Sequence, residues 1–218
     1  TRSEGFTSLA WQNRTGTGQG VSYPVLSMVQ DEDERLKTGY RKLIQSTMYV
    51  TFLIMLGMAA MAKPMIVTLI GEKWLPSVEY LQLLCFSAML FPLHALNLNI
   101  LNVKGRSDLF LRLEIVKKLL AVPVILAGIA LGIKAMLVGL IILSFISYFI
   151  NSYYSARLIR YPVSEQLEDI LPSFFVALAI SGLIFLISMI PGIGQLPLFV
   201  IQLVFMFVLT VIVSKVFK

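Results

Sequence analysis

Long hydrophobic runs alternate with short polar segments along most of this chain. Six runs of roughly 20 residues occupy positions 43–62, 77–102, 107–132, 135–156, 171–190 and 196–214. A helix of about that length is enough to cross the hydrocarbon core of a bilayer. The pattern therefore predicts an all-α membrane protein, with six transmembrane helices in residues 43–218 after a polar N-terminal segment, residues 1–42.

Prolines predict where these runs are interrupted. Proline removes a helical hydrogen bond and clashes with the preceding turn. We therefore expect the first span to end at Lys63-Pro64, with the short apolar piece 65–70 lying at the outer interface or re-entering the membrane. Pro92 lies in the middle of the second run and Pro123 inside the third.

The first 42 residues are the least membrane-like part of the sequence. Residues 14–20 contain three alternating glycines, which disfavour both helix and strand and predict a flexible loop. The following charged stretch, 31–42, has acidic residues before basic ones. That order suits the dipole of a short helix in water.

Composition supports the membrane assignment. The chain is 57% hydrophobic and only 14% charged, whereas about a quarter of the residues of a soluble domain are charged. Its single cysteine excludes a disulfide within the chain, and one histidine without a cysteine cluster argues against zinc. The net charge of +6 would suit nucleic acid, but the distribution of basic residues fits membrane topology better. We expect no nucleic-acid partner.

The basic residues predict the orientation of the spans. If the six spans alternate, 15 lysines and arginines lie on the side of the N-terminal segment, and the other 3 lie opposite. Lysine and arginine favour the cytoplasmic side of a membrane. Both termini are therefore expected in the cytoplasm.

The third run begins with charges that are costly inside a membrane. Arg112, Glu114, Lys117 and Lys118 follow the turn at 104–106, and the helical spacing brings Glu114 within reach of either lysine. One interpretation is that the lysines extend to the lipid headgroups. The alternative is a cationic wall of a water-accessible cavity that binds an anion such as a pyrophosphate.

Polar side chains also occur in the second and fourth runs. His94, Asn97 and Asn99 lie in the second, and Ser147 and Asn151 lie on one polar face of the fourth. Such groups can bind sugar hydroxyls or line a hydrophilic cavity, and they equally form hydrogen bonds between packed helices. The sequence leaves both interpretations open.

Enzyme signatures are absent from the sequence. It contains no G-x-S-x-G, no H-E-x-x-H and no calcium-binding loop spacing. We therefore expect neither catalysis nor a cofactor.

Several short stretches, taken in order, resemble one family. They are YPVLS at 23–27, YRK at 40–42, IGEKW at 70–74, LNLN at 96–99, KGRSD at 104–108 and LEIVKK at 113–118. Together they are similar to the C-terminal half of the polysaccharide biosynthesis flippases, which export lipid-linked oligosaccharides such as O-antigen precursors. That family belongs to the superfamily of multidrug and toxin extruders.

The resemblance implies a function and partners. The chain would be part of a two-lobe transporter of the bacterial inner membrane that moves undecaprenyl-pyrophosphate-linked oligosaccharide by alternating access. Its partners would be the bilayer, the lipid-linked oligosaccharide, an N-terminal lobe and other polysaccharide-assembly proteins. Coupling to a Na⁺ or H⁺ gradient is left open. The alternatives are a polytopic polymerase or ligase of the same pathway and a drug-extruding relative.

Overall fold

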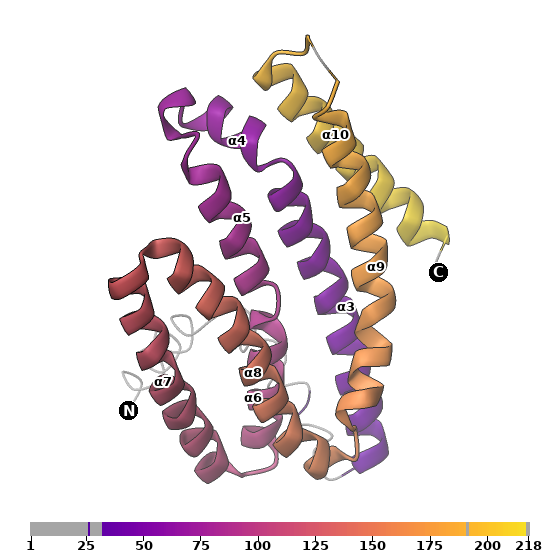
Figure 1. Cartoon of the computed structure of the whole chain (residues 1–218). Coiled ribbons are helices and arrows are strands. Elements are labelled where there is room, and N and C mark those ends of the chain that lie inside the picture. The colour runs from indigo at the N-terminus through magenta and orange to yellow at the C-terminus, as the bar shows by residue number, and fades with distance from the viewer. Residues whose placement is uncertain (1–25, 27–31, 191, 217–218) are drawn as a thin grey trace, which may run out of the picture.

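The structure is a computed structural model that describes residue 26, residues 32–190 and residues 192–216. Over these residues it is a bundle of long helices, which cross the molecule in alternating directions (Figure 1). The predicted all-α class is confirmed. The glycine-rich segment 14–20 lies outside the described residues.

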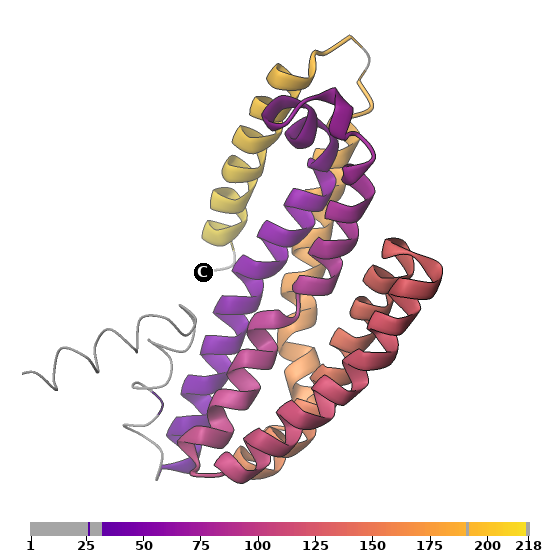
Figure 2. The ribbon, with the colours of Figure 1, turned by 90° about the vertical axis from the view of Figure 1, so that its left-hand side faces the viewer.

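The long helices start with α3 (Asp33–Ala60), followed by the short helices α4 (Ala62–Leu69) and η1 (Glu72–Trp74). Next come α5 (Ser77–Ala88) and α6 (Phe91–Val103), which together make one crossing. The chain then continues through α7 (Ser107–Leu131), α8 (Ile133–Ile159), α9 (Val163–Ile187) and α10 (Gln195–Val216). Figure 2 shows α7 and α8 as a hairpin that leans away from the upper part of the bundle.

Helix α3 forms the centre of the hydrophobic core. A buried residue recurs at every fourth position, which places these side chains along one face of the helix. They are Leu36, Tyr40, Ile44, Met48, Phe52 and Leu56. This face packs against α9, where Ala177, Ile180 and Ile184 are buried. Because the pattern begins at Leu36, residues 33–42 form the start of α3 and not a separate short helix, and the boundary expected at residue 43 lies inside this helix.

The predicted interruptions are confirmed, with small shifts in position. The first break falls at Met61, and Pro64 lies in the first turn of α4. The second falls at Met89 and Leu90, with Pro92 in the first turn of α6. A proline is tolerated in a first turn because the N–H that it lacks has no helical partner there. Pro123, by contrast, lies inside a continuous α7.

The fifth predicted span begins earlier than expected. We placed its start at residue 171, but α9 begins at Val163 and includes the polar residues Gln166 and Asp169 in its first two turns. Gln166 is fully buried and Asp169 binds a cation of α3, so both are compatible with a packed helix. The preceding α8 ends at Ile159, and the left-handed backbone of the next residue, Arg160 (φ 51°), is typical of a helix C-terminus.

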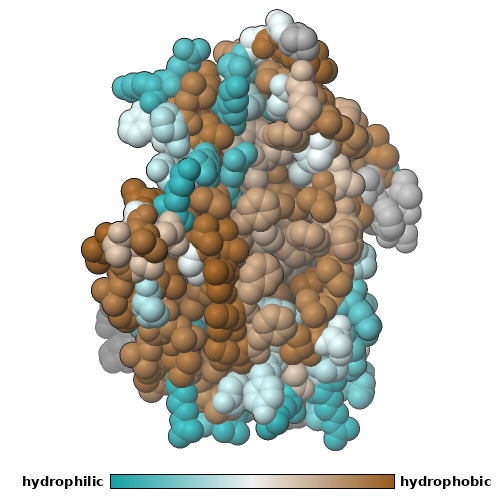
Figure 3. All heavy atoms as spheres, in the orientation of Figure 1, coloured by the Kyte–Doolittle hydropathy of each residue, from teal (hydrophilic) through white to brown (hydrophobic). Residues whose placement is uncertain are grey.

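Five crossings have the length and hydropathy of membrane spans among the described residues, with α5 and α6 counted as one. Helix α7 is not one of the five, because Glu114, Lys117 and Lys118 lie in its apolar part. The total of six spans therefore stays a prediction. Figure 3 shows apolar side chains over the middle of one face and hydrophilic ones at its lower end and upper left.

Candidate functional site

The predicted site residues lie on three neighbouring helices, α6, α7 and α8 (Figure 1). Within these helices they form two groups. One group is centred on Asn97 and is fully buried, and the other contains His94 and the charged residues of α7.

Asn97 is completely buried and joins four helices. Its Oδ1 accepts hydrogen bonds from the Tyr40 hydroxyl of α3 at 3.0 Å and from the Ser155 hydroxyl of α8 at 2.5 Å. Its Nδ2 donates to the Ser152 hydroxyl of α8 at 3.2 Å and reaches Oε1 of Gln166 in α9 at 3.5 Å. A buried amide costs several kcal/mol unless it is hydrogen-bonded, so this network fixes the mutual positions of the four helices.

The network continues to the end of the bundle where α8 meets α9. Gln166 donates to the carbonyl of Tyr161 at 3.2 Å, and the Tyr161 hydroxyl donates to Asp169 at 2.6 Å. Burial and the Asp169 carboxylate raise the pKa of Tyr161 well above its usual value, so the hydroxyl keeps its proton. Asp169 also accepts two hydrogen bonds from Arg41 and one from Gln45, at 2.9 Å.

These contacts bear on the polar face of α8. Ser152 and Ser155 form hydrogen bonds between helices, one of the two interpretations that the sequence left open. Ser147 and Asn151 are also buried on this face. Neither side-chain polar atom of Asn151 has a hydrogen-bond partner among the described residues. Asn99, which lies in the same stretch of α6 as Asn97, is buried as well.

The second group consists of His94 on α6, its partner on α8 and the charged residues of α7. The Nε2 atom of His94 lies 3.1 Å from the Ser144 hydroxyl of α8. On α7, Lys117 forms an ion pair with Glu114. The turn at 104–106 joins α6, which carries His94, to α7, which carries this pair.

The remaining basic residues of α7 point elsewhere. Lys118 and Arg112 are exposed, whereas the Lys117 side chain is only 16% exposed. Successive residues of a helix are separated by about 100° around its axis, so Lys117 and Lys118 cannot share one direction. Of the two lysines within reach of Glu114 by spacing, Lys117 is the one that pairs with it.

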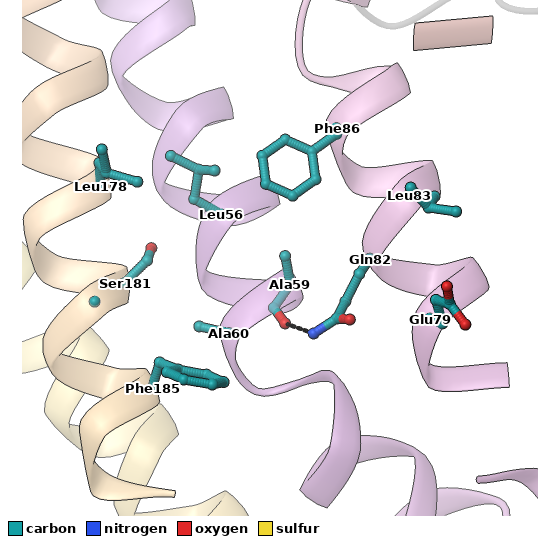
Figure 4. Close-up of a pocket in the computed structure, with 11 residues that line it drawn as sticks. Leu56, Ala59, Ala60, Glu79, Gln82, Leu83, Phe86, Leu178, Ser181 and Phe185 are labelled. Carbon is teal, nitrogen blue, oxygen red and sulfur yellow. Dashed lines mark hydrogen bonds between the residues drawn. The ribbon is translucent and has the colours of Figure 1, made fainter. Parts of the chain in front are cut away.

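A pocket of about 430 Å³ lies apart from both groups, between α3, α5 and α9 (Figure 4). Leu56, Leu83, Phe86, Leu178 and Phe185 give it an apolar lining, and the small residues Ala59, Ala60, Ser181 and Gly182 leave the space open. Glu79 and Gln82 provide its polar side. Gln82 donates to the Ala59 carbonyl at 3.1 Å, and Glu79 pairs with Lys134 at 2.5 Å.

Sequence reasoning missed Tyr40, Arg41, Gln166 and Asp169. Tyr40 carried a signal, because it lies on the four-residue repeat of buried positions in α3. The other three lie in charged or polar stretches that we assigned to water or to a loop. In the described part of the chain, histidine, cysteine and acidic side chains form no cluster of three that could bind a metal ion.

Comparison with known proteins shows what this chain is similar to. Residues 1–79 match a family described as polysaccharide biosynthesis protein. A Klebsiella pneumoniae protein described as an uncharacterized membrane protein in the cps region is 30% identical over 158 residues, 72% of this chain and 32% of that protein. No solved structure gives a significant match.

Two further relatives have more specific names. The lipopolysaccharide biosynthesis protein WzxC of Escherichia coli K12 is 28% identical over 50% of this chain and 22% of its own length. The teichuronic acid biosynthesis protein TuaB of Bacillus subtilis 168 is 24% identical over 78% of this chain and 35% of its own length. The matched part of the chain thus spans about a third or less of each of the three relatives. The inferred resemblance to polysaccharide biosynthesis membrane proteins is confirmed.

Proposed function

We propose that this chain, a relative of polysaccharide biosynthesis membrane proteins, is part of a transporter for a lipid-linked oligosaccharide. The transporter moves its substrate across the bacterial inner membrane for the assembly of surface polysaccharide. The names of the relatives support a role in polysaccharide biosynthesis. Transport itself is inferred from the charged residues in α7.

The observation that carries this proposal is the charge inside α7. At 1.5 Å per residue, Lys117 lies about 15 Å along the helix from Ser107. Ionised groups at membrane depth are costly, and they usually face a partner or a water-filled cavity. Glu114 neutralises Lys117, so the exposed Lys118 leaves one positive charge for an anion. The pyrophosphate of a lipid-linked sugar is such an anion.

The rest of the site fits an amphiphilic substrate. A hydrocarbon chain matches the apolar lining of the pocket between α3, α5 and α9, which is within the size range of ligand sites. The amide and hydroxyl groups of Asn97, Asn99, Ser147 and Asn151 lie on the helices next to α7. Of these, Asn151 has donor and acceptor atoms without partners in the described structure, which makes it the strongest candidate for a sugar contact.

Alternating access requires a second lobe. Two lobes that rock about a central site are the usual arrangement in transporters. The matched part of this chain spans about a third or less of its relatives, so an N-terminal lobe would complete the cavity. The proposed orientation places both ends of the chain in the cytoplasm. The start of α3, the turn at 104–106 and the start of α9 would face that side.

Replacing both lysines of α7 tests the proposal. In the full-length transporter, the double variant Lys117→Ala, Lys118→Ala should abolish glycan export while the protein is inserted at normal abundance. Arginine at both positions should retain part of the activity, because the charge survives while the geometry changes. Lys73→Ala, an exposed lysine of η1, is the matched control and should export normally. Normal surface glycan from the double-alanine variant would contradict the proposal.

A further inference from the structure

The pocket between α3, α5 and α9 changes from apolar to polar along its length. Its apolar end is lined by Leu56, Phe86 and Leu178. Gln82 and Ser181 follow in the middle, and Glu79 lies toward the other end (Figure 4). From Phe86 to Glu79 the distance along α5 is about 10 Å at 1.5 Å per residue, roughly a third of the hydrocarbon core of a bilayer. The pocket therefore has the depth and the polarity gradient of a lipid within one leaflet.

The hydroxyl of Ser181 gives this pocket a specific polar group. Ser181 is 6% exposed, and its hydroxyl has no hydrogen-bond partner among the described residues. Figure 4 shows this hydroxyl directed across the pocket toward α3. A buried hydroxyl without a partner costs free energy, so an acceptor supplied by a ligand is favourable. The ester carbonyl at which an acyl chain of a glycerophospholipid begins is such an acceptor, whereas a polyprenyl chain has no oxygen along its hydrocarbon part.

The polar end of the pocket carries one charge of each sign. Glu79 pairs with Lys134 of α8 at 2.5 Å, and both side chains are more than half exposed. Water competes with exposed ion pairs, so a ligand can replace one partner of this pair at low cost. A headgroup that contains a phosphate and an ammonium group complements both side chains, with the phosphate on Lys134 and the ammonium on Glu79. Phosphatidylethanolamine has this headgroup.

We propose that the pocket binds one acyl chain of phosphatidylethanolamine, with the ester carbonyl at Ser181 and the headgroup at Glu79 and Lys134. In the proposed orientation, this lipid comes from the periplasmic leaflet. The inference goes beyond the proposed function, because it concerns a membrane lipid and requires no transport. The proposed function brings the hydrocarbon chain of the substrate into the same space, so the phospholipid occupies the pocket while the substrate is absent.

Lipid retention measures the choice of headgroup. Full-length protein purified in mild detergent is incubated with equal amounts of phosphatidylethanolamine, phosphatidylglycerol and phosphatidylcholine with identical acyl chains, and native mass spectrometry identifies the bound lipid. Phosphatidylethanolamine should be retained several-fold more than the others, because phosphatidylglycerol lacks an ammonium group and that of phosphatidylcholine has no N–H to donate.

Two acidic positions at the same end of the bundle separate a specific contact from a general charge effect. Glu79→Gln should remove the preference for phosphatidylethanolamine. Glu72→Gln, which changes an exposed residue of η1 outside the pocket, is the matched control and should keep the preference. Absence of bound lipid in the wild type, or the same preference in wild type and Glu79→Gln, would overturn the proposal. Helical content measured on each variant identifies any variant that fails to fold.

The contact at Ser181 is tested with ester and ether lipids. Wild type should retain diacyl phosphatidylethanolamine several-fold more than the dialkyl ether form, because the ether lipid lacks the carbonyl acceptor. Ser181→Ala should abolish this difference, whereas Ser87→Ala, on α5 outside the pocket, should leave it unchanged. Equal ratios in wild type and Ser181→Ala would contradict the ester contact. Retention of a polyprenyl-linked substrate instead of phospholipid would overturn the proposal and leave the proposed function standing.

Discussion

Arg41 of α3 binds Asp169 of α9 through two hydrogen bonds, from Nε at 2.5 Å and from Nη2 at 2.8 Å, to the two carboxylate oxygens. The Asp169 side chain is 6% exposed and that of Arg41 is 42% exposed. This parallel geometry is the strongest form of an arginine–carboxylate pair. It joins α3 to α9 beside Tyr161, at the end of the bundle that we assign to the cytoplasmic side.

Asp169→Asn should destabilise the bundle. Loss of one partner from a fully buried ion pair costs about 3–5 kcal/mol. Solvent screens the half-exposed Arg41, so we expect about 1–3 kcal/mol here, measured as a lower unfolding temperature in detergent. Asp108→Asn is the matched control. It breaks the pair with Arg106, whose side chains are both about half exposed, and should cost at most about 1 kcal/mol. An equal decrease in unfolding temperature for both variants would contradict a special role for Asp169.

Asn97→Leu should destabilise the protein, although leucine is well suited to an apolar helix such as α6. In this buried site, the variant removes the hydrogen-bond acceptor of the Tyr40 hydroxyl. It also removes one of the two acceptors of the Ser155 hydroxyl. An unsatisfied buried polar group costs about 1–3 kcal/mol. Asn102→Leu, on a half-buried position of the same helix, should cost less. Thermal unfolding of the two variants side by side gives the comparison, and an unchanged Asn97→Leu midpoint would show that the network adds no stability.

Gly182→Leu should fill the pocket without disturbing the fold. A Cβ atom added at Gly182 meets no atom within 4 Å, and the residue lines the apolar space between α3 and α9. If a lipid chain occupies this space, the purified variant should retain less lipid, as measured by mass spectrometry. Gly39→Leu is the control, because it is also an exposed helical glycine with open space around it. Equal lipid retention by the two variants would exclude the pocket as a lipid site.

Cysteine labelling tests the orientation. In a background where the buried Cys85 is replaced by alanine, cysteines at Ser107 and Ser164 should react only with reagents that reach the cytoplasm. Both positions are exposed, and they belong to the first turns of α7 and α9, which start at the same end of the bundle (Figure 1). Cysteines at Ser77 and Gln195, near the opposite end, should react from the periplasm. Labelling of Ser107 from outside would reverse the proposed topology.

Hydropathy and proline positions predicted much of the fold. The apolar character of a span and the break near a proline both depend on residues that are close together in the sequence. The breaks at Met61 and at Met89–Leu90 follow from Pro64 and Pro92. The start of α9 was missed because polar residues such as Gln166 and Asp169 suit a buried helix face only when they bind partners, and these partners are distant in the sequence. Those partners, Asn97 and Arg41, are separated from them by 69 and 128 residues in sequence.

The sequence assigned the candidate residues to three runs, and these runs are neighbouring helices in the structure, α6, α7 and α8. It treated Lys117 and Lys118 as one cationic unit, although the helical period separates neighbouring residues around the axis. Arg112 is also on the exposed side of α7. Which lysine pairs with Glu114 depends on how α7 packs against α6 and α8, and local spacing does not determine that.

The break between α5 and α6 separates two parts of one crossing. Each part is about 18–20 Å long at 1.5 Å per residue. Because Pro92 lacks an N–H, the carbonyl of Ala88 has no helical donor four residues ahead, and the two segments are joined by fewer backbone hydrogen bonds than a continuous helix has. Helix α5 borders the pocket, whereas α6 carries Asn97 and His94. A tilt of α5 about this joint would change the width of the pocket and leave the polar contacts of α6 in register.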